Sequence, residues 1–306
     1  MIVLNSLFPV FGLLILGGLL KRWNLTNDAF LKTSDKLIYF IFFPVMLFWK
    51  IGNAPIATGS QSNLYLAGIG AVGIVFILST ISIKLFRVTN YQAGSYSQSC
   101  FRFNTYVGVA IVMNSLGDEG IRYFSILIGI IIPMINALVI FILIWYSGKN
   151  YSIFQRLKFS GKALVSNPLI IGCITGVIYS KVVGTFPTFL DNTFSLVSMI
   201  TLPLALLSLG GALSFSSLQR YFRISLIASI FKMLVLPLVG YALLRHLEVS
   251  GVAFTTGMIF FTLPTSTALY VLSGQLNSDT DLASASIVLS TILSFFSLSI
   301  TLLLWQ

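Results

Sequence analysis

The sequence predicts an all-helical protein that crosses a membrane many times. Apolar residues make up 57% of the 306 residues, and charged residues make up only 8%. Soluble domains carry about 25% charged residues, so 18 basic and 8 acidic side chains cannot coat a water-soluble globule of this size. The mean hydropathy of +0.96 agrees with this. These observations exclude soluble enzymes, nucleic-acid-binding proteins and disordered proteins.

Ten segments are long and apolar enough to span the hydrocarbon core, which needs roughly 17–25 residues of helix. They are residues 2–20, 35–51, 64–86, 94–115, 121–146, 166–183, 194–213, 222–244, 251–275 and 282–305. We expect the first segment to be retained, because its basic residues follow it, whereas those of a secretory signal precede it. The longest connection, 147–165, holds Lys149, Arg156, Lys158 and Lys162. It predicts a cytoplasmic basic linker, with an interfacial amphipathic helix as the alternative.

Basic residues are distributed unevenly between alternate connections. If the N-terminus lies outside, twelve Lys and Arg fall in inside connections and only four in outside ones. Two more, Arg102 and Lys232, fall within segments. Short cytoplasmic connections of membrane proteins carry an excess of Lys and Arg. We therefore expect a multi-pass protein of the cell membrane (plasma or inner membrane) with both termini outside.

An internal repeat relates the two halves of the chain. Three pairs of residues in corresponding segments are each 159 positions apart: Pro9 and Pro168, Pro44 and Pro203, Gly17 and Gly176. The chain therefore divides into a first repeat at 1–146, the linker at 147–165 and a second repeat at 166–306. Each half has five segments, an odd number, so the second half enters the membrane from the opposite side. Such inverted repeats are typical of secondary transporters.

The fourth and ninth segments each contain a break near the middle. Pro264 removes a backbone donor, and Thr265 and Ser266 after it are good first residues for a new helix. Asn104 and Thr105 hold the equivalent place in the first half, 160 positions before Pro264 and Thr265. Non-helical backbone at this depth is tolerated only inside the protein or beside a water-filled cavity. A simple proline kink in the ninth segment is the alternative interpretation.

Two half-helices that begin at the midplane would direct their N-termini toward each other. Unpaired N–H groups and about half a positive charge at each N-terminus favour an anion. Gly108, one turn after Asn104, lets another backbone approach closely. The middle of these segments contains no Asp or Glu that could occupy the donors. The pattern therefore predicts a site for a small anion, most simply a carboxylate.

Three further residues are candidates for the site, and two of them, Arg102 and Tyr270, have an alternative role. Arg102 is either a counter-ion for the substrate or a side chain that extends to the lipid phosphates. Lys232 lies deep in the eighth segment, and an ionisable residue at that depth is a functional hypothesis by default. Tyr270 follows the break in the ninth segment and either lines a cavity or packs against neighbouring helices.

The ordered motifs of both breaks resemble those of the auxin efflux carrier family. They are Asn104-Thr105-Tyr106-Val107-Gly108 followed by Gly117-Asp118-Glu119-Gly120, and Leu263-Pro264-Thr265-Ser266 followed by Tyr270-Val271-Leu272. The bacterial branch, which is malate- or malonate-permease-like and related to the plant PIN carriers, is the closer match. It shares the opening Phe8-Pro9-x-Phe11 and the later Phe43-Pro44.

The resemblance implies a ten-helix fold of two inverted five-helix repeats. One part would be a scaffold, and the other would transport the substrate through helices 4 and 9, which are broken and cross at the midplane. The resemblance also implies that Asn104 contacts the substrate carboxylate. Ala110 and Leu269 stand where the plant proteins have further prolines, and the third segment lacks an acidic residue. The resemblance therefore does not extend to auxin as the substrate.

Together these features predict a secondary transporter, a permease or efflux carrier that moves a small organic anion across the membrane by alternating access. An anion channel and a transporter-derived sensor are the alternatives. We expect no enzyme, because the single histidine, His246, cannot form an HExxH site and no pair of deep carboxylates exists. We expect no cofactor, metal or nucleic-acid partner. The coupling ion and the formation of a homodimer are left open. The predicted substrate-binding residues are Asn104, Thr105, Gly108, Arg102, Pro264, Thr265, Ser266, Tyr270 and Lys232.

Overall fold

The computed structural model describes residues 2–53, 61–146 and 168–305, and every regular element within these ranges is helical. The elements are α1 (Ile2–Arg22), α2 (Asp28–Leu37), η1 (Ile38–Phe42), α3 (Phe43–Gly52), α4 (Gln61–Leu85), α5 (Asn90–Phe101), α6 (Thr105–Tyr146), α8 (Pro168–Val182), α9 (Thr188–Ala212), α10 (Leu218–Ile230), η2 (Phe231–Val235), α11 (Leu236–His246), α12 (Gly251–Thr262), α13 (Ala268–Gln275) and α14 (Thr280–Trp305). The all-helical prediction is confirmed for this part of the chain. The linker predicted at 147–165 lies outside the described residues.

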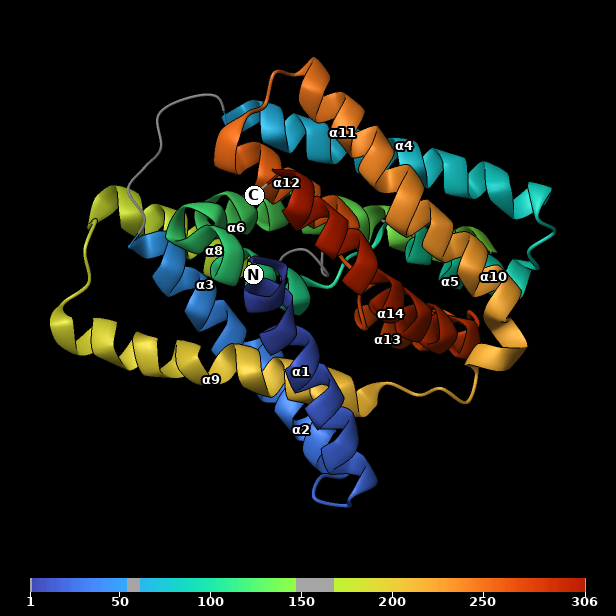
Figure 1. The fold of residues 1–306 in the computed structure, drawn as a ribbon, viewed down its shortest axis with the longest axis horizontal. Coiled ribbons are helices and arrows are strands. Elements are labelled where there is room, and N and C mark those ends of the chain that lie inside the picture. The colour runs from blue at the N-terminus through green and yellow to red at the C-terminus, as the bar shows by residue number, and fades with distance from the viewer. Residues whose placement is uncertain (1, 54–60, 147–167, 306) are drawn as a thin grey trace.

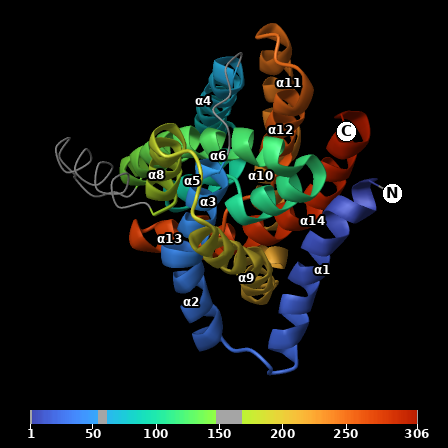
Figure 2. The ribbon, with the colours of Figure 1, turned by 90° about the vertical axis from the view of Figure 1, so that its left-hand side faces the viewer.

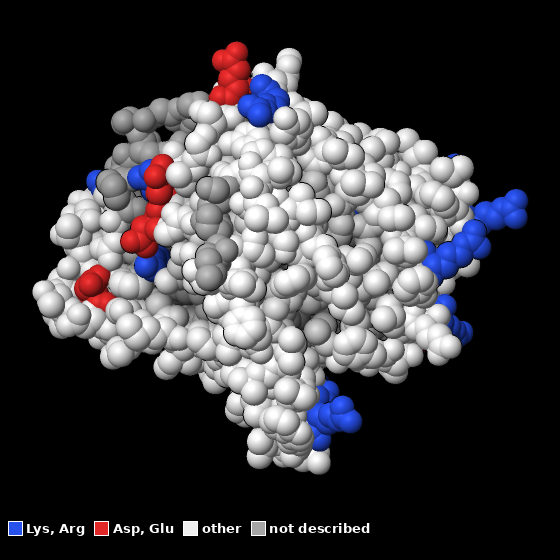
Figure 3. Space-filling model, in the orientation of Figure 1, with Lys and Arg blue, Asp and Glu red and all other residues white. Residues whose placement is uncertain are grey.

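The surface of the molecule is that of a multi-pass membrane protein. Large apolar side chains such as Phe8 and Leu238 are 70% and 60% exposed. Charges lie at the ends: Lys and Arg gather at the right-hand edge and lower end of Figure 3, and Asp and Glu lie at the left and top beside a few basic residues. In the described ranges, six helical stretches are long and apolar enough to cross a membrane. They are Val3–Arg22, Ser62–Leu85, Asn90–Tyr146, Thr188–Ala212, Leu218–His246 and Thr280–Trp305.

The helices pack in two groups. In the first group, α1 crosses α9 and α3 lies along α8. In the second, α11 lies beside α4, and α10 packs against α14 (Figure 1). The N-terminal end of α1 and the C-terminal end of α14 lie near each other in both views (Figures 1 and 2).

Glycines allow the helices of the first group to touch backbone to backbone. A Cβ atom added at Gly17 of α1 would overlap the carbonyl of Leu207 in α9. A Cβ atom added at Gly176 of α8 would lie 3.0 Å from the carbonyl oxygen of Phe48 in α3, closer than nearly all real contacts. Small residues at such crossings let membrane helices approach closely and gain van der Waals contact. The α1–α9 and α3–α8 contacts therefore depend on the absence of side chains.

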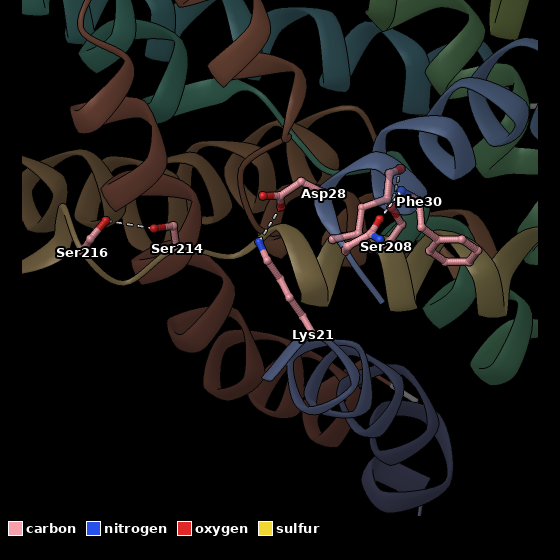
Figure 4. Close-up of polar contacts among 8 residues, drawn as sticks. Lys21, Asp28, Phe30, Ser208, Ser214 and Ser216 are labelled. Carbon is pink, nitrogen blue, oxygen red and sulfur yellow. Dashed lines mark hydrogen bonds and ion pairs between the residues drawn. The ribbon is translucent and has the colours of Figure 1, made fainter. Parts of the chain in front are cut away.

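The second predicted segment begins earlier than its apolar run. The side chain of Asn27 caps α2, so the helix starts at Asp28, before the predicted start at residue 35. Lys21 at the end of α1 forms an ion pair with Asp28 at 2.8 Å (Figure 4). Ser208 of α9 donates a hydrogen bond to Asp35 at 2.5 Å. Polar side chains at the two ends of α2 thus hold it against both α1 and α9.

Two π-helical turns precede prolines. The turn η1 comes before Pro44, and the turn η2 comes before Pro237. Proline lacks an N–H and its ring clashes with the preceding turn, and a widened turn accommodates both effects. The second of these turns contains Lys232. The widened turn therefore sets the position of the deepest lysine in the described chain.

The long helix α6 consists of two helices joined at Gly117. This glycine has φ 61° and ψ −150°, a backbone conformation that residues with a side chain rarely adopt. The chain reverses there, between the predicted fourth and fifth segments. The part of α6 that begins at Thr105 is therefore a half-helix that follows the first break.

Candidate functional site

The interruptions of the fourth and ninth segments meet inside the protein. The first lies between α5 and α6, and the second lies between α12 and α13. The Asn104 N–H donates to the Pro264 carbonyl at 2.8 Å. The Thr265 hydroxyl donates to the Ser99 carbonyl at 2.9 Å. Two stretches that are far apart in the sequence thus bind each other directly.

Local sequence explains why each helix stops and restarts. The first residue after α5 and the first after α12 have nearly the same extended backbone, with φ −69° and ψ 147° at Arg102 and φ −65° and ψ 148° at Leu263. The Asn104 side chain then caps α6 by accepting the Val107 N–H at 3.1 Å. In the second break, the Ser266 hydroxyl accepts the Ala268 N–H at 3.3 Å. Polar side chains thus replace the missing helical hydrogen bonds.

Four helix ends converge on this contact, and their partial charges differ. The N-termini of α6 and α13 carry partial positive charge, and the C-termini of α5 and α12 carry partial negative charge. The two basic residues lie at the negative ends. Arg102 follows α5 directly, and the Lys232 ammonium donates to the Phe261 carbonyl near the end of α12 at 3.2 Å. The N-termini of α6 and α13 are therefore the ends suited to an exogenous anion.

The described residues give neither basic group an acidic partner. Arg102, which is 9% exposed, donates to the Gln98 side chain at 3.4 Å and to the Asn136 side chain at 3.2 Å. Lys232 is completely buried. The ion pairs that join described residues to one another, Lys21–Asp28 and Lys50–Asp118, include neither Arg102 nor Lys232. Within the described residues, both buried basic groups therefore have neutral oxygen atoms as their hydrogen-bond acceptors.

The structure brings most of the predicted site residues together. Asn104, Pro264 and Thr265 are buried at the contact itself. Thr105 and Ser266 are partly buried beside them. Asn104 and Thr105 come from the first break, and Pro264, Thr265 and Ser266 come from the second.

Two other predicted residues have different surroundings. Gly108 is packed, because a Cβ atom there would overlap the Phe124 ring and would lie 2.7 Å from Leu263. Its close neighbours are therefore side chains. Tyr270 on α13 is 51% exposed, so it lies outside the buried contact.

Sequence reasoning missed a buried polar chain that extends from Arg102. Gln98 accepts from Arg102 and donates to Ser273 of α13 at 3.2 Å. Ser95 then donates to Ser273 at 2.8 Å and is 3.0 Å from Ser278. The signal was present in the composition of α5, because polar residues fill a helix whose last nine residues are all buried. These hydrogen bonds join α5 to α13 on one side of the breaks.

Removing the Thr265 hydroxyl is expected to destabilise the protein. Thr265→Val keeps the shape of the side chain but leaves the buried Ser99 carbonyl without its donor, which costs about 2 kcal/mol of unfolding free energy. Thermal unfolding of the purified protein in detergent measures the loss. Thr256→Val is the matched control, because the partner that the described structure gives the buried Thr256 hydroxyl is the Val252 carbonyl of its own helix. Equal melting temperatures for the two variants would mean that the contact between the breaks adds no stability.

The chain is similar to known membrane transport proteins. The family model described as membrane transport protein matches residues 2–302. An uncharacterized transporter of Methanocaldococcus jannaschii is 22% identical, over 98% of this chain and 98% of that protein. One of Methanothermobacter thermautotrophicus is 23% identical, over 96% and 95%. A Rhizobium meliloti protein named "Putative malonate transporter" is 22% identical, over 95% and 92%. The chain therefore belongs to the membrane transport protein family, the auxin efflux carrier family that its motifs resemble.

Proposed function

We propose that the protein is a secondary transporter that moves a small organic anion, of the carboxylate class, across the cell membrane by alternating access. The observation that carries this proposal is the contact between the two breaks, from which the half-helices of α6 and α13 begin. Helix N-termini that meet inside a membrane protein form a site for an anionic group. Asn104, Thr105, Thr265 and Ser266 are the side chains that would hold the carboxylate there. Arg102 and Lys232 would add positive potential.

The fold behind this proposal is ten membrane-crossing segments in two inverted repeats, 1–146 and 166–306. Its support is a pair of equivalent contacts. Gly17 lies against the Leu207 carbonyl, and Gly176 lies against the Phe48 carbonyl. Gly17 and Gly176 are 159 positions apart, and so are Phe48 and Leu207. The same backbone contact thus occurs twice, with the partners exchanged between the two halves, which supports a two-fold relation between them.

Alternating access would use the two packing groups. The helices α1, α3, α8 and α9 would form the scaffold, since their crossings are backbone-close at glycines. The broken segments would move as one body, because Thr265 binds Ser99 and the polar chain joins α5 to α13. Movement of this body against the scaffold would expose the anion to each side in turn.

The same arrangement supports an orientation in the membrane. The start of α1 and the end of α14 lie near each other, which supports placing both termini on one side. The gathering of Lys and Arg toward one edge and the lower end in Figure 3 supports a cytoplasmic assignment for those ends. Both termini would then lie outside the cell. The name of the Rhizobium meliloti relative supports a dicarboxylate such as malonate as the first substrate to test.

A ligand screen of the purified protein tests the proposal. Malonate, malate, succinate, acetate and lactate are added separately, and thermal unfolding is recorded with chloride as the reference anion. We expect at least one carboxylate to raise the melting temperature, because a ligand that binds only the folded state stabilises it. In liposomes the same compound should show saturable uptake and counterflow. Linear flux without counterflow would instead favour a channel, and the absence of any carboxylate response would overturn the substrate class.

A further inference from the structure

Lys232 is the most deeply buried charge in the described chain, and its surroundings differ from those of an ordinary buried lysine. The side chain is 0% exposed. A buried ammonium without compensation is very costly, and most are paired with an acid. Here the ammonium donates to a backbone carbonyl, that of Phe261, at 3.2 Å. The acceptor that the structure gives this ammonium is therefore a neutral oxygen atom at the end of α12.

No helix packed around η2 brings a carboxylate near Lys232. The turn contacts α4, α5, α10, α11, α12 and α14. Neither α5 nor α12 contains a charged residue, and the charges of the other four lie near their ends: Lys84, Arg220, Arg223, Arg245, His246 and Asp281. The one acidic residue in that set, Asp281, lies in the first turn of α14 and accepts a hydrogen bond from Ser217 at 3.2 Å.

The carbonyl end of α12 is instead rich in oxygen ligands. The last four carbonyls of a helix have no helical partner and carry the negative end of its dipole. The Ser297 hydroxyl lies 3.2 Å from the Thr262 carbonyl oxygen and 3.3 Å from the sulfur of Met233, the residue that follows Lys232 in the chain. Thr301 lies 3.3 Å from the Thr262 hydroxyl. Carbonyls and hydroxyls at the C-terminus of a broken helix are the groups that bind Na+ in cation-coupled carriers.

We propose that the Lys232 ammonium is a tethered cation, which occupies the place at the carbonyl end of α12 that a Na+ ion takes in a cation-coupled carrier. The consequence of this tethered cation for transport rests on the proposed function. If the protein binds a carboxylate, a built-in cation makes that binding independent of Na+. The occupancy itself does not depend on any substrate. The position of Lys232 in the widened turn η2 places the ammonium against Phe261.

The test measures thermal unfolding of the full-length protein in chloride salts of Na+, Li+, K+ and choline at equal ionic strength, without carboxylates. We expect the wild-type protein to melt at the same temperature in all four salts. For Lys232→Ala, we expect Na+ or added methylammonium to raise the melting temperature by about 3 °C or more over choline. The exposed Lys84→Ala serves as the matched control and should show no such response.

A second variant covers the case in which Lys232→Ala does not fold. Lys232→Gln keeps a donor for the Phe261 carbonyl, lacks the charge and offers an amide oxygen to a bound ion. Its response to Na+ is then decisive. Stabilisation of the wild-type protein by Na+, or a folded neutral variant that ignores both Na+ and methylammonium, would overturn the proposal. Carboxylate binding that requires Na+ in the wild type would overturn it too, while leaving the proposed transport function intact.

Discussion

Replacing Asn104 by aspartate is expected to weaken carboxylate binding about 100-fold while the protein stays folded. The Asn104 Oδ1 atom accepts the Val107 N–H and so caps α6. Aspartate is as good a helix N-cap as asparagine, so the start of the half-helix keeps its acceptor. The change places a negative charge where we propose that the substrate carboxylate binds, and juxtaposed like charges cost several kcal/mol. Isothermal titration with the best ligand of the carboxylate screen measures the affinity.

Two further variants separate the effect of the added charge on ligand affinity from the effect of losing the helix cap. Asn104→Ala removes the cap, at a cost of about 1 kcal/mol of stability, and adds no charge. Its affinity should fall only about tenfold, the typical value of one lost hydrogen bond to a charged group. Asn114→Asp puts the same charge on an exposed position of α6 and should bind as the wild type does. If Asn104→Asp binds the ligand with unchanged affinity, the start of α6 is not the anion site.

Much of the fold could be predicted because a membrane limits the secondary structure that a chain can adopt. Apolar runs must be helices that satisfy their own backbone hydrogen bonds, so composition and spacing already indicate helices and their approximate ends. The helix ends that hydropathy misplaces are those formed by polar residues or marked by proline. Asn27 starts α2 ahead of the apolar run, and α9 begins directly after Pro187. Both are capping or proline signals, which hydropathy does not register.

The candidate site, too, could be predicted only in part from the sequence. Asn104 and Pro264 could be predicted, since a capping amide and a proline act on their own backbone. The partners of the two basic residues could not, because contacts between distant helices depend on rotation and depth. Lys232 reaches Phe261 through a widened turn, and Arg102 reaches Asn136 on α6. Only Pro237 marks that turn in the sequence, and a proline does not specify which way its neighbours face.

Placing a valine at Gly17 is expected to be among the most destabilising single changes in the chain. An added Cβ atom would overlap the Leu207 carbonyl, which belongs to the backbone of α9 and cannot rotate away as a side chain can. The helices must then separate, at a cost of about 3 kcal/mol of unfolding free energy. Gly12→Val is the matched control on the same helix, because nothing lies within 4 Å of a Cβ atom there.

The equivalent change in the second half tests the repeat itself. Gly176→Val should destabilise through the Phe48 carbonyl, and by less than Gly17→Val, because the added Cβ atom would lie 3.0 Å from that oxygen rather than overlapping it. Melting temperatures of the three purified variants should therefore rank Gly12→Val highest, Gly176→Val next and Gly17→Val lowest. A Gly176→Val protein as stable as the Gly12→Val control would show that the two glycines are not equivalent. This pair of contacts would then no longer support the inverted repeat.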